Sequence, residues 1–296
     1  RAELDELPER LYLLVVDARA IAQHVSDKTG TPVAKLQAVK ESAEYGDIVG
    51  TIGKKGYGQA HLHEPIADAL ILDRTKLRDP IAPIGTFFFP GLTGTGKTET
   101  AKVVAEEYFG GNLITFNCNE MQKSHELAKI FGAPPGYVGF EGGSRLAEDV
   151  RKAGGRAVIL LDEIEKAHYD IWTLFMQIFD SGMMRDNEGK EVDLRNCMFI
   201  LNSNLASDVM AEQADDGKYK DMGAVVAGLK RAMNTPPNTE GVGKPEVLGR
   251  ISNITANGND VDFSNAIANP LSFEVMGLIL SKVFSDFADR VETNQN

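Results

Sequence analysis

Apolar residues in the middle of the chain form short continuous runs that are separated by amphipathic stretches. Such runs, bounded by turn residues, predict strands that are covered on both faces. We predict strands over residues 86–90, 112–117, 157–161 and 197–202, and helices over residues 97–108, 122–131, 144–152 and 171–180. Strands that alternate with helices in this order predict an α/β fold with a central parallel sheet and right-handed crossovers.

Two of the amphipathic stretches carry a marked stripe of large apolar side chains. In residues 171–180 the stripe has helical spacing and predicts a helix that faces the core; it consists of Trp172, Phe175, Met176 and Phe179. In residues 271–291 a second stripe consists of Met276, Ile279, Leu280, Val283, Phe284 and Phe287. We predict that this second helix begins a separate, incomplete helical domain.

The remaining segments have weaker patterns. We expect a mostly helical lead-in at the start of the chain, a loop over the glycine-rich residues 42–59, and a helix over residues 62–74. In the polar residues 210–244, a helix over residues 224–233 is the only clear element. These patterns divide the chain into a lead-in, a large α/β domain and the start of a small helical lid, at residues 1–45, 46–265 and 266–296.

A glycine-rich turn follows the first predicted strand and leads directly into a predicted helix. Its sequence fits the phosphate-binding pattern G-x-x-x-x-G-K-[ST]. Glycines permit positive φ and let backbone N–H groups approach phosphate oxygens, the lysine reaches the β- and γ-phosphates, and the hydroxyl binds Mg²⁺. The candidate nucleotide contacts are Gly91, Leu92, Thr93, Gly94, Thr95, Gly96, Lys97, Thr98 and Glu99. The strand, turn and helix predict a P-loop NTPase, a three-layer sandwich around a parallel sheet.

Two carboxylates end the apolar strand over residues 157–161. Ligands of open α/β sheets bind at the carboxyl ends of the strands, so Asp162 and Glu163 should lie close to the glycine turn. Asp162 can hold Mg²⁺ through a water molecule, and Glu163 can polarise the water that attacks the γ-phosphate. The candidate metal ligands are therefore Thr98 and Asp162, and the candidate cofactors are ATP and Mg²⁺.

Composition limits the other classes of function. The chain has 296 residues and a formal net charge of −12, so it lacks the basic surface expected of a nucleic-acid motor. Its longest apolar run, residues 11–16, is too short to cross a membrane. Two cysteines, Cys118 and Cys197, suit a reducing cytoplasm. The neighbouring His61 and His63 have no cysteine or acidic cluster beside them, so we expect surface residues.

Several separated motifs together resemble the Clp family of AAA+ ATPases, specifically the second, C-terminal ring of protein disaggregases and remodellers. Besides the glycine turn, the resemblance includes A-I-A-Q-H-V-S-D-K-T-G-T-P-V at residues 20–33 and G-A-P-P-G-Y-V-G at residues 132–139. It also includes L-D-E-I-E-K-A-H at residues 161–168 and K-P-E-V-L-G-R-I at residues 244–251. The motifs occur in the family's order and cover most of the chain from residue 17 to about residue 290.

The resemblance implies a hexameric ring that acts on polypeptides, and it implies roles for particular residues. Tyr137 and Val138 would grip a polypeptide in the central pore, although a surface aromatic is the alternative. Asn204 would be the sensor of the γ-phosphate, or an ordinary turn residue. Arg250 would act in the neighbouring subunit's site, or form an intrachain ion pair. Gly56 and Tyr57 would contact adenine, or lie in a plain loop.

The chain departs from the family pattern at a few positions. Leu92 replaces a proline, Asn202 a threonine and Gly249 an asparagine, and none of these changes removes a catalytic group. No Gly-Ala-Arg segment follows to supply a second sensor arginine. Because the chain opens with Arg1 and ends in a polar tail, we expect a portion of something longer, for which hydrolysis in isolation is doubtful.

A predicted hairpin turn at residues 186–189 follows Met183 and Met184. These methionines either form a second loop that faces the channel or pack in the core. No Ile-Gly-Leu/Phe tripeptide of peptidase-coupled relatives occurs on an exposed loop, which favours remodelling over delivery to a protease. The leading interpretation is an ATP-driven motor that threads proteins; the alternatives are a nucleotide-gated assembly ATPase that holds a partner complex and a nucleic-acid translocase.

Overall fold

The computed structural model describes residues 43–132, 143–186, 188–236, 238, 243–257, 260–263 and 266–293. The chain divides into two compact units, residues 1–48 and 49–296. In the first unit only the beginning of helix α3 (Ala43–Lys55) is described. The second unit contains the sheet, its covering helices and all the sites discussed below. The domain boundaries expected from the sequence stay predictions.

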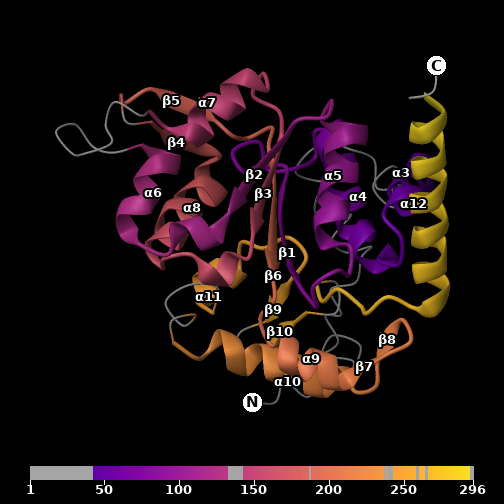
Figure 1. The fold of residues 1–296 in the computed structure, drawn as a ribbon. Helices are drawn as coiled ribbons and strands as arrows, with labels where there is room; N and C mark the ends of the chain where they lie inside the picture. The colour runs from indigo at the N-terminus through magenta and orange to yellow at the C-terminus, as the bar shows by residue number, and fades with distance from the viewer. Residues whose placement is uncertain are drawn as a thin grey trace, which may run out of the picture. The chain divides into compact units, whose positions relative to one another are not determined.

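A four-stranded parallel sheet forms the centre of the second unit (Figure 1). Its order is β1-β6-β3-β2, and its strands are β1 (Gly85–Pro90), β6 (Met198–Ser203), β3 (Val158–Asp162) and β2 (Leu113–Asn117). All four strands predicted from the apolar runs are therefore present, and each boundary agrees within one residue. The predicted α/β class with a central parallel sheet is confirmed.

Helices cover both faces of this sheet. In Figure 1, α4 (Ala60–Arg74) and α5 (Lys97–Tyr108) lie to the right of the strands, and α6 (Ser124–Phe131) and α8 (Asp170–Ser181) lie to the left. Helix α7 (Arg145–Lys152) lies beside α6 and packs near β2. The strands alternate between the two faces: Phe88 and Phe199 belong to the large cluster beneath α6–α8, whereas their neighbours point toward α4 and α5. The stripe predicted on α8 is buried at Trp172, Phe175 and Phe179.

The outer side of β1 is closed by polar side chains rather than by another strand. Ser252 N donates to the Thr86 carbonyl at 2.6 Å, and Ser252 Oγ accepts from Thr86 N at 2.9 Å. The Asn253 amide then exchanges two hydrogen bonds with Phe88, Nδ2 to O at 2.9 Å and N to Oδ1 at 3.0 Å. These bonds satisfy backbone groups that β1 would otherwise leave unpaired at the edge of the sheet.

Two expectations about the connecting segments are wrong. Residues 43–55, expected as loop, form α3, and Gly56 N closes its last turn on Ile52 O at 2.7 Å. Burial of Ile52 stabilises the helix despite its glycines. Between residues 207 and 233 there are two helices, α9 (Ser207–Gln213) and α10 (Met222–Met233), that contact each other. The hairpin β7 (Ala214–Asp215) and β8 (Lys218–Tyr219) joins them, so the helix expected over residues 224–233 is not the only element.

Short elements complete the unit. The predicted hairpin at residues 186–189 is present, with β4 (Met183–Arg185) antiparallel to β5 (Glu191–Asp193). Met184 packs in the core and Met183 is half-buried, which supports the core-packing alternative for Met184. The 3₁₀ helices η2 (Cys118–Met121) and η4 (Ile164–Lys166) follow β2 and β3. Farther along are α11 (Pro245–Leu248) and the hairpin of β9 (Thr255–Asn257) and β10 (Asp260–Asp262).

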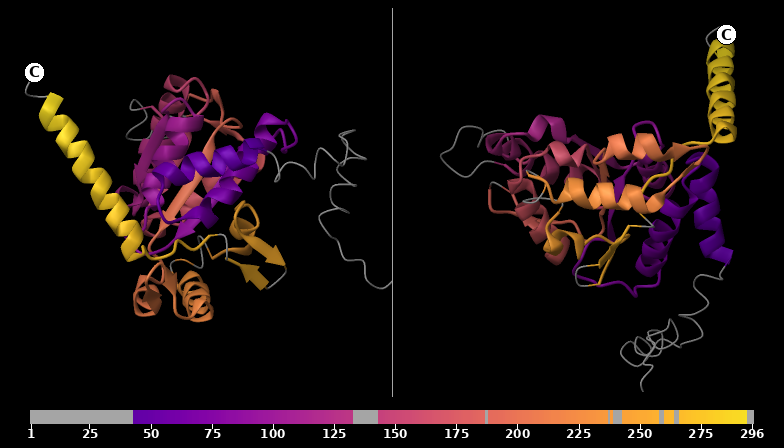
Figure 2. Two further views of the ribbon diagram at one scale, coloured as in Figure 1. Left: turned by 90° about the vertical axis from the view of Figure 1, so that its right-hand side faces the viewer. Right: turned by 90° about the horizontal axis from the view of Figure 1, so that it is seen from below.

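The last element is the long helix α12 (Phe273–Thr293), predicted over residues 271–291. In both views of Figure 2, most of its length extends beyond the other helices and strands. Most of its described apolar residues are exposed, with Phe273 at 77% and Phe284 at 69%, whereas Val275 and Ile279 are half-buried. Among the described residues, no helix combines the length and the apolar character needed to span a bilayer.

Candidate active site

The glycine turn has the conformation that its sequence predicts. Gly94 and Gly96 have φ values of 81° and 93°, in the left-handed region that a side chain disfavours. A Cβ added at Gly94 would meet no atom within 4 Å and would project into open space. Gly91 is glycine for a different reason, because a Cβ there would lie 2.7 Å from Ala268 Cβ. The turn is thus shaped for an approaching ligand at Gly94 and for close packing at Gly91.

Helix α5 begins at Lys97, directly after this turn. The Lys97 side chain is only 7% exposed, and its Nζ donates to the carbonyl oxygens of Gly91 and Leu92, both at 2.7 Å. Burial lowers the pKa of Lys97 to about 8, and the carboxylates of Asp162 and Glu165 oppose that shift. A buried ammonium group held mainly by neutral carbonyls is a site for an anion.

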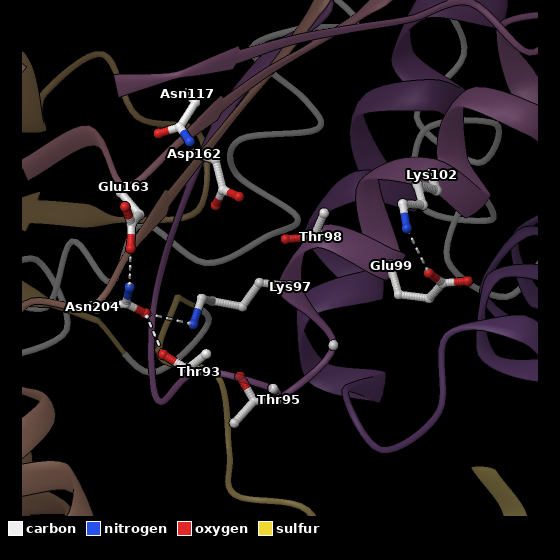
Figure 3. A pocket seen from close by; sticks show the side chains of 12 residues that line it. Thr93, Thr95, Lys97, Thr98, Glu99, Lys102, Asn117, Asp162, Glu163 and Asn204 are labelled. Carbon is white, nitrogen blue, oxygen red and sulfur yellow. Dashed lines mark hydrogen bonds and ion pairs between the residues drawn. The ribbon is translucent and has the colours of Figure 1, made fainter. Parts of the chain in front are cut away.

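The turn borders a cavity of about 530 Å³, which we call the loop cavity (Figure 3). It is lined by Thr93, Gly94, Thr95, Gly96, Lys97, Thr98, Glu99, Lys102, Asn117, Asp162, Glu163 and Asn204. The structure therefore brings both carboxylates, predicted from a strand some sixty residues away, to the glycine turn. Lys97 and Glu163 share one cavity, which is the condition that a nucleotide-hydrolysing site requires.

The two carboxylates leave the end of β3 in different directions. Asp162 is the last residue of the strand, and Figure 3 shows its side chain pointing toward Thr98. Glu163 has φ 55° and ψ 49°, an uncommon left-handed conformation for a residue with a Cβ. Its carboxylate accepts hydrogen bonds from Asn204 Nδ2, at 3.3 Å, and from Asn119 Nδ2. Two amide groups thus fix the Glu163 carboxylate at the side of the cavity opposite α5.

Asn204 links this carboxylate to the glycine turn. Its Oδ1 accepts from Thr93 Oγ1 at 3.5 Å and from Lys97 Nζ at 3.4 Å, as the dashed lines in Figure 3 show. Its backbone N donates to Glu165 Oε1 at 3.1 Å. The sequence signalled Asn204 only through the family resemblance, and it did not signal Asn119 or the supporting role of Glu165.

Asn202 is a residue of the site whose role the sequence did not predict. It is buried on β6, and its Nδ2 donates to Thr98 Oγ1 at 3.1 Å and to Asp162 Oδ1 at 3.3 Å. The sequence indicated on which face of the sheet Asn202 lies, because successive side chains of a strand point to opposite faces. Asn202 shares a face with Ile200, away from the cluster that contains Phe199 and Leu201, and α5 lies on that side.

A second hollow of about 370 Å³ adjoins the first, and we call it the helix pocket. It is lined by Lys55, Gly56, Tyr57, Gly94, Gly96, Glu99, Leu271, Ile279, Lys282 and Val283. Gly56 and Tyr57, expected at an adenine site, therefore lie beside the glycine turn. The buried Gln59 holds this region together, since its Nε2 donates to Thr95 O at 2.9 Å and to Asn269 O at 2.8 Å.

The remaining predicted residues lie elsewhere. Arg250 does not line the loop cavity; its guanidinium forms a bidentate ion pair with Asp180 at the end of α8, with Nη2 to Oδ2 at 2.7 Å. This is the intrachain ion pair named as the alternative for Arg250, and it leaves the proposed role in a neighbouring subunit untested. Tyr137 and Val138 lie outside the described residues.

The prediction that His61 and His63 are surface residues is wrong. His63 is 1% exposed, and both of its ring nitrogens are buried without a hydrogen-bond partner among the described residues. Burial lowers the pKa of His63 to about 4, with a smaller contribution from His61. The half-buried His61 makes a hydrogen bond of 2.8 Å between its Nε2 and Ile267 O. Close packing under Gly56, where an added Cβ would lie 3.3 Å from His63 Nε2, explains the burial.

The residues present fit a nucleotide and a magnesium ion. The positive φ values of Gly94 and Gly96 and the buried Lys97 ammonium suit an anion at the start of α5. The Thr98 hydroxyl and the Asp162 carboxylate, both bonded to Asn202, supply the oxygen ligands that Mg²⁺ prefers. The helix pocket offers a tyrosine and aliphatic side chains that suit a planar base.

The similarity to solved structures covers nearly the whole chain and not the site alone. A closed-state cryo-EM reconstruction of Hsp104 with ATPγS and FITC casein superimposes with a TM-score of 0.71 and 29% sequence identity, covering 95% of this chain and 45% of that one. The Hsp104–ADP complex of S. cerevisiae gives a TM-score of 0.70 at 29% identity, covering 94% of this chain and 44% of that one. Parallel sheet and flanking helices are thus shared with Hsp104.

Sequence comparison identifies the family. The chaperone protein ClpB of Staphylococcus aureus (strain N315) is 34% identical over 291 residues, which are 98% of this chain and 31% of ClpB. The AAA+ ATPase ClpV1 of Pseudomonas aeruginosa (strain PAO1) is 37% identical over 249 residues, 83% of this chain and 27% of ClpV1. The chain thus spans about a third of the length of these relatives, and the resemblance to Clp-type proteins is confirmed. A profile of the AAA domain (Cdc48 subfamily) matches residues 82–254, and the chain belongs to that family.

Proposed function

We propose that this chain binds ATP with Mg²⁺ and hydrolyses the nucleotide, as one module of a ring motor that unfolds, threads or remodels polypeptides. One observation carries the proposal. Side chains from the start of α5, the end of β3 and the end of β6 meet in the loop cavity. They include a buried cation, a hydroxyl, two carboxylates and an amide, which is the set that phosphoryl transfer to water uses.

Each side chain has a role that follows from its place. Lys97 binds phosphate oxygens. Its buried ammonium donates to the neutral carbonyls of Gly91 and Leu92, and a charged phosphate is a stronger hydrogen-bond acceptor than either carbonyl. Glu163 orients the attacking water and accepts its proton on a carboxylate oxygen. Asn204 keeps that carboxylate in place and lies between it and Lys97, where it can contact both the water and the terminal phosphate. Thr98 and Asp162 would hold Mg²⁺, which would supply neutralisation of phosphate charge.

The adenine base belongs, in this proposal, in the helix pocket. Tyr57 offers an aromatic face, and Leu271, Ile279 and Val283 offer aliphatic contacts. Because both pockets share Gly94, Gly96 and Glu99, a single nucleotide can extend from one pocket into the other. The nucleotide would then touch both the sheet and α12.

The action on polypeptides rests on family membership and on two residues. We propose a hexamer in which Arg250, which lies outside its own loop cavity, reaches the phosphates of the neighbouring subunit, and Tyr137 grips the threaded chain. The Hsp104 reconstruction with casein supports a polypeptide substrate. The net charge of −12 speaks against nucleic acid as the substrate, and two buried, free cysteines suit a reducing cytoplasm.

The test compares Glu163→Gln and Tyr137→Ala with the unsubstituted protein. We expect Glu163→Gln to lower ATP turnover by about 10²- to 10⁴-fold, because the water loses its base, while ATP binding is retained. Glu191→Gln, at an exposed glutamate on β5, serves as the control. Undiminished turnover in Glu163→Gln would defeat the catalytic assignment.

We expect Tyr137→Ala to keep ATP turnover and to lose protein unfolding, whereas Tyr169→Ala, an exposed tyrosine before α8, should lose neither. Unchanged unfolding in Tyr137→Ala would defeat threading. Slow turnover with ATP-dependent assembly and no unfolding activity in the unsubstituted protein would instead support the nucleotide-gated assembly ATPase.

A further inference from the structure

Asn202 occupies the centre of the sheet at the edge where the loop cavity opens. It lies on β6, next to Phe89 of β1 in the strand register, one position beyond the pair of Leu161 and Leu201 that joins β3 to β6. Its side chain is 1% exposed. It therefore stands between the strand that leads to the glycine turn and the strand that ends in Asp162.

The Asn202 amide reaches two side chains that come from different elements. From one nitrogen, Nδ2, it donates to Thr98 Oγ1 on α5 at 3.1 Å and to Asp162 Oδ1 on β3 at 3.3 Å. These two side chains are the ones that the proposed function assigns to Mg²⁺. Each accepts one hydrogen bond from Asn202, so the remaining lone pairs of Thr98 Oγ1 and the second oxygen of Asp162 stay available to the metal and its water.

The other end of the same amide contributes nothing to the fold. Asn202 Oδ1 is buried and accepts no hydrogen bond from the described residues. A buried acceptor without a donor costs free energy, and an apolar side chain of similar size would avoid that cost. Asn202 thus costs folding free energy and donates hydrogen bonds to two residues of the site. Its presence is therefore explained by a role in the site and not by a role in the fold.

We propose that Asn202 is a positioning residue for Mg²⁺, which sets the spacing and orientation of the Thr98 hydroxyl and the Asp162 carboxylate before the metal binds. The inference rests on the proposed function, since it concerns the same nucleotide site. An amide suits the task because it has two N–H bonds at a fixed angle, one for each ligand. A hydroxyl at the same position donates only one hydrogen bond, so it can hold one ligand and not both.

The test separates metal binding from nucleotide binding. The dissociation constant of ATPγS is measured by calorimetry over a series of Mg²⁺ concentrations and again in EDTA. We expect Asn202→Leu to raise the Mg²⁺ concentration needed for half-maximal affinity by about tenfold or more, as for other residues that orient metal ligands. In EDTA its affinity should stay within about twofold of the unsubstituted chain, because Lys97 and the glycine turn are untouched.

Two more variants make the result decisive. Asn202→Thr keeps one of the two donated bonds, so its Mg²⁺ requirement should fall between those of the other two proteins, and it carries the test should Asn202→Leu not fold. Asn112→Thr is the matched control, since Asn112 Nδ2 also donates to two oxygens, Ala153 O at 3.3 Å and Arg156 O at 3.1 Å, just before β2 begins. It should leave the Mg²⁺ requirement unchanged.

The outcomes distinguish this inference from the proposed function. Superimposable Mg²⁺ titrations for Asn202→Leu or Asn202→Thr and the unsubstituted chain would overturn the inference alone. An equal loss of ATPγS affinity with and without Mg²⁺ would also overturn it, because Asn202 would then support the whole site rather than the metal. No binding of ATPγS by the folded, unsubstituted chain would overturn both the inference and the proposed function.

Discussion

The loop cavity and the helix pocket lie side by side, but they are built in different ways. The loop cavity is polar. Its charged lining residues are Lys97, Glu99 and Lys102 on α5 and Asp162 and Glu163 at the end of β3, a strand whose backbone is fixed by ladder hydrogen bonds. The helix pocket combines the segment after α3, the glycine turn and one side of α12. Its shape depends on side-chain packing against a helix on which most of the described apolar residues are exposed.

The difference shows which part of the site is rigid. Parallel strands hold Asp162 and Asn202 at spacings that do not depend on any ligand. By contrast, α12 is held by individual contacts, among them a hydrogen bond from Phe273 N to Asp216 Oδ1 at 2.6 Å and the ammonium of Lys282 over the Tyr57 ring. We therefore expect phosphate binding to be largely preorganised, and base binding to be sensitive to the packing around Gly56 and α12.

The largest effect should come from the loop cavity. We expect Lys97→Ala to weaken the binding of both ATP and inorganic tripolyphosphate by about 100-fold, because charge-assisted hydrogen bonds to phosphate are lost. Calorimetry with the two ligands measures this. Lys152→Ala, an exposed lysine paired with acidic residues on α7, is the control. Tripolyphosphate binding that survives Lys97→Ala would mean that the phosphates do not bind at this lysine.

The next-largest effect should be a loss of folding stability at acid pH, caused by His63, which packs against Gly56 of the helix pocket. His63 has a pKa of about 4 in the folded chain, well below its ordinary value of 6.5, because it is buried. Between these values the unfolded chain takes up a proton that the folded chain does not. Stability is therefore unaffected above about pH 6.5 and falls as the pH drops toward 4, by about 2 kcal/mol at pH 5.

Denaturant unfolding at pH 7 and pH 5 measures this loss. His63→Phe should remove about 2 kcal/mol of the difference between the two pH values. His125→Gln, at an exposed histidine on α6, is the control. A pH dependence that is the same in His63→Phe and the unsubstituted chain would show that His63 is not the acid-sensitive group.

The smallest effect should separate the two pockets most cleanly. We expect Tyr57→Ala to weaken ATP binding by about tenfold, through loss of contact with the base, and to leave tripolyphosphate binding unchanged. Tyr57→Phe keeps the ring and should bind ATP normally. An equal loss of affinity for tripolyphosphate would show that the two pockets behave as one unit. The loop cavity could then not be called rigid in contrast to an adaptable helix pocket.

The same contrast explains what the sequence could reveal. The four strands and α5 were predictable because continuous apolar runs and the glycine turn are local signals, and the carboxyl ends of parallel strands meet at one edge. Asp162 and Glu163 followed from that rule. Helix α3 was not predictable, because its glycines argue against a helix and the burial of Ile52 comes only from tertiary packing.

Residues that act through others were the hardest to predict. Asn202 appeared only as a departure from a threonine, and its contacts with Thr98 and Asp162 require the strand register. Asn119 approaches Glu163 through η2, a short turn with no periodic pattern. His63 was misplaced because its burial results from the glycines above it rather than from its own sequence neighbours.

The polar closure of β1 has a consequence for behaviour at high concentration. A bare sheet border is a template on which another molecule can add a strand, and such addition leads to aggregation. Ser252 and Asn253 already occupy the backbone groups of Thr86 and Phe88 that a foreign strand would use. At the opposite border, the charged Arg145 lies over Phe116 and donates to Thr115 O. Both rims of the sheet, in the part of the chain that the structure describes, therefore resist edge-to-edge growth.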